Sequence, residues 1–134
     1  MTVFPSQSWL NALVVKLNSD QHYAEVARKW EGDLMFVIES DGPLKNMERI
    51  YLDLWHGKCR GAYFLNPDQV VEAAFVLKAP YGNFIQILTG ELEPMRAMLT
   101  RKLGVKGDMS VMMRNIPTVL DFVRCCREIT TGRL

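Results

Sequence analysis

The chain has few cysteines and no excess of charge of either sign. Its 134 residues include Cys59 and the adjacent Cys125 and Cys126 as the three cysteines, and they carry a formal net charge of +1. Three cysteines make no complete set of disulfide pairs, and their spacing matches no zinc site, so we expect reduced thiols, a cytoplasmic location and no metal. A balanced charge also gives no electrostatic sign of a nucleic-acid partner.

Long apolar runs and targeting segments are missing as well. No stretch approaches the roughly 18 consecutive apolar residues of a membrane-spanning helix. The first residues lack the basic region of a signal peptide, and the closing Gly132-Arg133-Leu134 is only loosely similar to the S-K-L peroxisomal address. We therefore predict no integral membrane segment.

The common catalytic signatures do not occur. The chain contains no H-E-x-x-H, no C-x-x-C and no phosphate-binding G-x-x-x-x-G-K-[ST] pattern. His22 and His56 have no Cys or Ser partner at a telling spacing, and the glycines and basic residues of 57–61 fall within a hairpin. We therefore predict no enzyme activity, no catalytic residue and no cofactor.

What the chain does contain is an ordinary globular composition, with 49% hydrophobic and 23% charged residues over the length of one domain. Residues 6–31 predict two helices, with Ser6 as the N-cap of the first, Asn18-Ser19-Asp20 as the break that caps the second, and Gly32 as a left-handed stop. Apolar residues recur at helical spacing in both, at Leu10, Leu13, Val14 and Leu17, and at Tyr23, Val26, Ala27 and Trp30.

After the second helix the hydrophobic period changes to two. Alternating apolar residues predict five strands, over residues 34–39, 48–55, 58–65, 71–78 and, at an edge, 103–107. The turns between them are short, for example His56-Gly57, and short links favour antiparallel pairing of successive strands.

From residue 80 onward the helical period returns. Pro80 and Pro94 suit the first turns of two helices, and Gly104 suits the end of the second. Asp108 is an N-cap for a further helix, which Pro117 kinks or restarts. Of the last two cysteines, we expect only Cys126 to face the core, because neighbours on a helix point in different directions.

These elements predict an α+β fold in one domain, residues 1–134. Its parts are the two N-terminal helices at 6–31 and the sheet and helices at 33–129. The sheet is expected to be mostly antiparallel, with about five strands covered by helices.

Two helices of the C-terminal half carry methionine-rich stripes. Thioether side chains are flexible and polarizable, so a surface made of them can adapt to apolar molecules of different shape. The same spacing also serves an ordinary solid core, and the pattern does not separate the two. Five of the eight methionines lie on these stripes, which are Met95, Met98 and Leu99, and Met109, Met112, Met113 and Ile116.

Several short motifs follow one another in a telling order. They are Trp55-His56-Gly57, Gly61, Ala73 to Leu77, Gly90, Glu93-Pro94 and Gly107-Asp108. This order, over residues 33–125, resembles the type-2 sterol carrier protein domain, also called the non-specific lipid-transfer domain. The chain departs from the family pattern at Arg101, where a glycine is usual before the Lys-hydrophobic pair, and at Ala74, where an acidic residue is common.

The resemblance implies helices over a five-stranded sheet that enclose an apolar tunnel. Such proteins bind fatty acids, acyl-CoA, sterols or phospholipids without changing them. On this chain the resemblance and the periodicities together predict a headgroup near Lys102 or Lys106 and a ligand-binding wall of Ile50, Leu52, Leu54, Phe75, Leu77, Phe84, Leu88, Met95, Met98, Leu99, Met109, Met112, Met113 and Ile116.

Two other functions stay open at this point. A small α+β enzyme of the isomerase or dehydratase type would need a carboxylate, with Asp53 as the best candidate, inside the cavity with a raised pKa. An accessory interaction module of a larger lipid-metabolising assembly would show a filled core and a large exposed apolar patch. Dimerisation of the chain with a second copy is also open.

Overall fold

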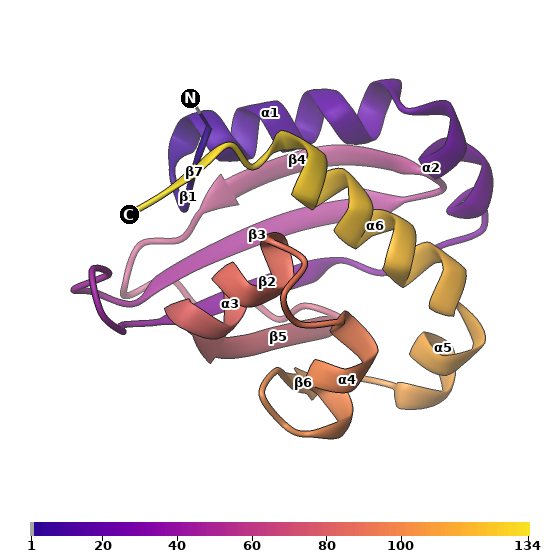
Figure 1. The fold of residues 1–134 in the computed structure, drawn as a ribbon. Coiled ribbons are helices and arrows are strands. Elements are labelled where there is room, and N and C mark those ends of the chain that lie inside the picture. Colours follow the sequence, from indigo (N-terminus) through magenta and orange to yellow (C-terminus); the bar gives the residue numbers. More distant parts are fainter. Residues whose placement is uncertain (1) are drawn as a thin grey trace.

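A computed structural model describes residues 2–134, and it shows an α+β fold with helices over one face of a five-stranded sheet (Figure 1). The strand order is β4-β3-β2-β5-β6, with all neighbours antiparallel except β2 and β5. The sheet strands are β2 (Leu34–Glu39), β3 (Glu48–Trp55), β4 (Lys58–Phe64), β5 (Phe75–Pro80) and β6 (Gly104–Lys106). The predicted fold class is confirmed.

Two N-terminal helices begin at the predicted caps. The Ser6 side chain accepts a hydrogen bond from the first turn of α1 (Gln7–Ser19), and Asp20 does the same for α2 (Gln21–Val26). The buried face of α1 contains Trp9, Leu10, Leu13 and Leu17, and it packs on the sheet and on α6 (Ile116–Ile129). The second helix is shorter than predicted, and Gly32 has no positive φ, so its expected role as a left-handed stop is wrong.

The turn between β3 and β4 is as tight as predicted. His56 and Gly57 both have positive φ, 49° and 77°, as the two-residue hairpin turns that match strand twist require. A Cβ at Gly57 would lie 2.7 Å from the carbonyl oxygen of Ala24, so glycine is needed here for space as well as for conformation.

Strand β5 differs most from the prediction. It starts at Phe75 rather than at residue 71, and it pairs in parallel with β2 instead of following β4. The segment between β4 and β5 therefore crosses the outer face of the sheet, where Met35, Val37 and Leu65 form a second small core. The first five residues of β2 are buried, which is why this strand can serve as the sheet's centre.

The remaining helices are α3 (Tyr81–Leu88), α4 (Pro94–Leu99), α5 (Met109–Arg114) and α6. Glu93 caps α4, and Asp108 caps α5 as predicted, whereas α3 and α6 begin without a side-chain cap. After α4 the left-handed residue is Arg101, with φ of 60°, so the stop assigned to Gly104 is wrong. Gly104 instead begins β6.

The two ends of the described chain lie side by side. Strand β1 (Val3–Phe4) pairs in parallel with β7 (Gly132–Arg133), and the Trp9 indole N–H donates to Thr130 Oγ1 at 2.7 Å. Phe4 is thereby fixed in the core. No helix within residues 2–134 combines the length and the apolar character needed to cross a bilayer.

Candidate binding cavity

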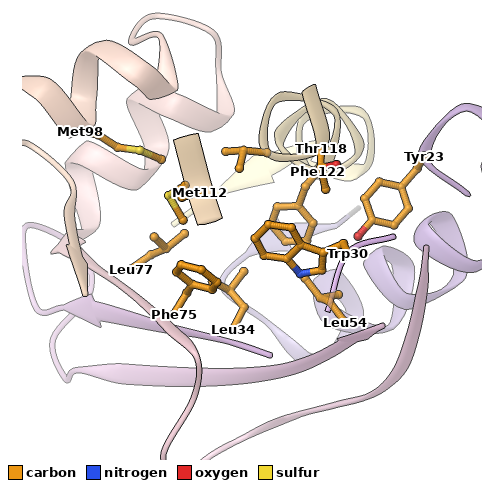
Figure 2. A pocket seen from close by; sticks show the side chains of 11 residues that line it. Tyr23, Trp30, Leu34, Leu54, Phe75, Leu77, Met98, Met112, Thr118 and Phe122 are labelled. Carbon is orange, nitrogen blue, oxygen red and sulfur yellow. The ribbon is translucent and has the colours of Figure 1, made fainter. Parts of the chain in front are cut away.

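Two apolar cavities lie between the inner face of the sheet and the helices. The first has a volume of about 40 Å³, measured as the space open to the centre of a water-sized sphere. Figure 2 shows its side chains converging from the sheet and from the helices above it. The wall consists of Tyr23, Trp30, Leu34, Leu54, Phe75, Leu77, Met98, Met112, Thr118, Val119 and Phe122.

The second cavity adjoins the first and has about 50 Å³ of room by the same measure. Its wall consists of Phe4, Trp9, Phe36, Leu77, Phe84, Ile87, Leu88, Pro94, Met98, Leu103, Val119, Phe122, Val123 and Cys126. Four side chains, Leu77, Met98, Val119 and Phe122, belong to both walls. We call these four the septum.

Both cavities are free of charged side chains. Neither wall contains an Asp, Glu, Lys, Arg or His among the described residues. In the first wall the Trp30 indole N–H donates to Gly32 O at 2.9 Å, and Thr118 Oγ1 donates to Val26 O at 2.9 Å. The Tyr23 hydroxyl is the other polar group. Such walls suit an apolar molecule and exclude a charged one.

An ion cluster outside the cavities fixes α6 against α2. Arg124 of α6 bonds Asp20 and Asp121, each at 2.7 Å, and Asp121 is only 6% exposed. Burial alone would raise the pKa of Asp121, but hydrogen bonds from Arg124 and His22 outweigh it and lower the pKa below its usual range. The cluster holds Tyr23 beside Phe122, with ring centroids 6.5 Å apart.

Comparisons with known proteins agree with this geometry. The sequence profile of the SCP-2 sterol transfer family matches residues 10–119. The chain belongs to the SCP-2 sterol transfer family. A crystal structure of sterol carrier protein 2 is similar at 31% identity, over 92% of this chain and 96% of that one, with a TM-score of 0.83.

Other solved structures share the SCP-2 fold. A conserved hypothetical protein of Thermus thermophilus is 30% identical over 98% of this chain and 93% of that one, with a TM-score of 0.85. The Aedes aegypti sterol carrier protein-2, solved in complex with palmitate, is 20% identical over 87% of this chain and 92% of that one, with a TM-score of 0.57. At that identity the likeness shows the fold alone. No curated protein matches the chain at a significant level.

The predicted ligand-binding residues divide into those that line the SCP-2 cavities and those that do not. Ile50 and Leu52 are fully buried outside both walls, and Met95 and Ile116 are half-buried there. Leu99, Met109 and Met113 are 80%, 41% and 50% exposed. The residues that line a cavity are Leu54, Phe75, Leu77, Phe84, Leu88, Met98 and Met112. Contact of any of the fourteen with a ligand stays a prediction.

Fewer residues of the methionine stripes face the cavities than their helical spacing predicted. Helices α4 and α5 are six residues long each, so a helix of under two turns directs only part of its stripe to the core. From α4 only Met98 reaches a cavity besides Pro94, and from α5 only Met112. Lys102 and Lys106 are exposed and line neither cavity.

The C-terminal helix α6 contributes more residues to the SCP-2 cavities than the predicted wall includes. Val119, Phe122 and Val123 all line a cavity, and the helical spacing of these residues was the available signal. Cys125 and Cys126 are both buried, at 0% and 2% exposure, so the expectation that only Cys126 faces the core is wrong. Cys125 belongs to the same core cluster as Tyr23, because α6 packs against both α1 and α2.

Asp53, the carboxylate that the enzyme hypothesis requires inside the cavity, lies outside it. Asp53 lies on the outer face of β3, opposite the buried Leu52 and Leu54, and it pairs with Arg60 at 3.0 Å. It lines a shallow outer depression with Tyr51 and neither of the apolar cavities. The placement of Asp53 inside the cavity is therefore wrong.

Proposed function

We propose that the chain binds a hydrophobic ligand in the space between sheet and helices and carries it without chemical change. The class of ligand is a fatty acid, an acyl-CoA, a sterol or a phospholipid. The observation that carries the proposal is the pair of adjoining apolar cavities, which share the septum and contain no charged side chain.

Relatives support the ligand class. The family is named for sterol transfer, and the Aedes aegypti protein of the same fold was solved with a 16-carbon fatty acid. In this chain, residues of α4, α5 and α6 meet β2 and β5 around the cavities. A cytoplasmic location and a homodimer stay predictions.

The cavities must widen to admit such a ligand. Drug-sized molecules occupy pockets of roughly 300–1,000 Å³, whereas the two cavities have about 40 and 50 Å³ of room for a water-sized sphere. Met98 and Met112 are the adaptable side chains of the wall. Helix α4 buries only Pro94 and Ala97, and α5 buries only Met112, so both can move outward at small cost.

The energy of such binding is sufficient. Burying a 16-carbon chain contributes roughly 12 kcal/mol at ~0.8 kcal/mol per methylene. Lost freedom of motion removes at least ~4 kcal/mol. The remaining ~8 kcal/mol corresponds to micromolar affinity before the cost of widening. No charged pair is needed.

Carriage without catalysis fits the same walls. General acid–base chemistry requires a titratable group within hydrogen-bond reach of the substrate. Among the described residues that line the cavities, the groups that titrate are the Tyr23 phenol and the Cys126 thiol. Burial raises the pKa of both, which keeps them in their neutral forms.

A blocked cavity tests the proposal. Val119 belongs to the septum, so Val119→Phe places a ring where both cavities meet. Val15→Phe makes the same change on the outer side of α1, where Val15 is 67% exposed. Native mass spectrometry of protein purified from cells reports bound lipid, and titration with a fluorescent 16-carbon fatty acid reports affinity.

We expect wild type and Val15→Phe to bind the fatty acid equally, and Val119→Phe to bind at least tenfold more weakly, about 1.4 kcal/mol. Circular dichroism confirms that both variants are folded. A wild-type protein that is purified without lipid and takes up no fatty acid would contradict the function. Equal binding by Val119→Phe would contradict its location.

A further inference from the structure

The side chain of Tyr23 stands out among the buried polar groups. It is 1% exposed and lies in the wall of the first cavity, held there by α2, whose first turn is capped by Asp20. Figure 2 shows its hydroxyl directed toward the other side chains of that wall. Among the hydrogen bonds of residues 2–134, none involves this hydroxyl, and no side-chain oxygen or nitrogen there is both fully sealed off and unpartnered, so the hydroxyl borders the open space of the cavity.

Comparable buried groups do have partners. The Trp9 and Trp30 indole N–H groups donate to Thr130 Oγ1 and Gly32 O at 2.7 and 2.9 Å. The Tyr81 hydroxyl donates to Phe4 O at 3.2 Å and accepts from the Leu134 N–H at 2.9 Å. The Tyr23 hydroxyl differs from them because it borders a cavity and has no protein partner there, so a polar group of a molecule in the cavity could pair with it.

A second hydroxyl lines the same cavity. Thr118 Oγ1 uses its proton on Val26 O, at 2.9 Å, and its oxygen keeps capacity to accept a further hydrogen bond. Burial raises the pKa of Tyr23 well above its usual range, so its phenol stays protonated and able to donate. Two hydroxyl-bearing side chains thus belong to the lining of a cavity whose surface is otherwise apolar, and of the two only the Tyr23 hydroxyl has its proton free to donate.

We propose that the Tyr23 hydroxyl recognises an uncharged oxygen of the ligand, a hydroxyl or carbonyl group seated in the first cavity. This inference rests on the proposed function. A carboxylate or phosphate does not suit this place, because no cation lines the wall to replace its lost hydration. Ligands with a charged head therefore bind with that head outside the first cavity.

The test compares two probes that differ by one oxygen, 1-dodecanol and dodecane, through their displacement of Nile red. Tyr23→Phe removes only the hydroxyl. Tyr81→Phe is the matched control, because Tyr81 is also buried but its hydroxyl has protein partners and it lines neither apolar cavity.

We expect Tyr23→Phe to bind dodecanol about threefold to tenfold more weakly than wild type does, the range of one neutral hydrogen bond, and to bind dodecane unchanged. Its melting temperature without ligand should stay level or rise, whereas that of Tyr81→Phe should fall. Tyr81→Phe should keep the wild-type ratio of the two affinities.

Other results overturn the inference. If Tyr23→Phe binds both probes as wild type does, the hydroxyl does not recognise the ligand, although the proposed function stands. The same holds if Tyr23→Phe weakens both probes equally, since its effect would then be one of packing. If wild type binds neither probe, the proposed function and the inference fail together.

Discussion

Phe122 is one of the four septum residues, and its replacement by alanine tests whether the two cavities form one ligand path. The ring is 7% exposed, lies in both walls, and packs against Phe36 at 6.2 Å between centroids. We expect Phe122→Ala to join the two cavities. A long ligand then no longer has to displace the ring.

The expected cost to the ligand-free protein follows from the position of the ring. Replacing a buried Phe by Ala costs about 3–5 kcal/mol. We expect the lower end, about 3 kcal/mol, because the ring already borders two cavities and so lacks part of its contacts. For a domain of this size that is a fall in melting temperature of roughly 10 °C.

Ligand should reverse part of this loss. At a free ligand concentration of about 100 times Kd, binding stabilises a protein by ~2.7 kcal/mol. If the ring opposes binding, Phe122→Ala gains about tenfold in affinity, and the ligand stabilises it by ~1.4 kcal/mol more than it stabilises wild type. Urea unfolding with and without a saturating fatty acid measures both quantities.

Leu13→Ala is the control, because Leu13 is fully buried on α1 and lines neither cavity. It should lose a similar free energy of unfolding without gaining in the response to ligand. A response of Phe122→Ala no larger than that of wild type would refute the idea that the septum lies across the ligand path.

Three further predictions concern the scaffold. Burial would raise the pKa of Asp121, but hydrogen bonds from Arg124 outweigh it and lower the pKa. The ionised Asp121 therefore stabilises the fold above about pH 4, and this part of the free energy of unfolding is lost as the pH falls below that value. Urea unfolding at about pH 2–6 should show a smaller loss of stability on acidification in Arg124→Gln than in wild type. Gly57→Ala should cost more than about 2 kcal/mol, whereas Gly42→Ala, also at positive φ but with no atom within 4 Å of its new Cβ, should cost about 1 kcal/mol; equal melting temperatures would contradict the clash. Burial raises the pKa of Cys125 to about 11, so a thiol reagent at pH 8 should label native protein far more slowly than protein in 8 M urea, and rapid native labelling would show that this end of α6 opens.

Local chemistry was the best guide from sequence to structure. The N-caps at Ser6 and Asp108 are confirmed, and within the predicted break at residues 18–20 the cap is Asp20, because capping depends on a side chain and the backbone a few residues away. Strands β2 and β3 have the predicted bounds, since their alternation and their turns are equally local. The family resemblance, which depends on the order of such signals, is confirmed too.

What depends on distant parts of the chain was harder to predict. Val71 and Ala73 alternate like a strand, but they pack on the outer face beside β2 and do not pair. Alternation reports that one side is buried and does not identify the neighbour that buries it. The parallel pairing of β2 with β5 was missed for this reason.

The candidate site met the same limit. Apolar spacing marked Met98 and Leu99 alike, yet one lines both cavities and the other is 80% exposed. Spacing identifies a helix face, and only the length and packing of that helix decide how much of the face is covered. Phe4 lines the second cavity from a two-residue strand, and a segment of two residues is too short to show any hydrophobic period in the sequence.

The pairing of β1 with β7 has a practical consequence for the preparation of the protein. Phe4, part of the second cavity, is held by a two-residue strand whose partner, Arg133, lies near the opposite end of the chain. A purification tag fused next to either strand could disturb this pairing and so displace Phe4 from the cavity wall. Proteolytic removal of either strand would leave Phe4 without its backbone partner. Affinities should therefore be compared before and after tag cleavage, with a flexible spacer between tag and strand.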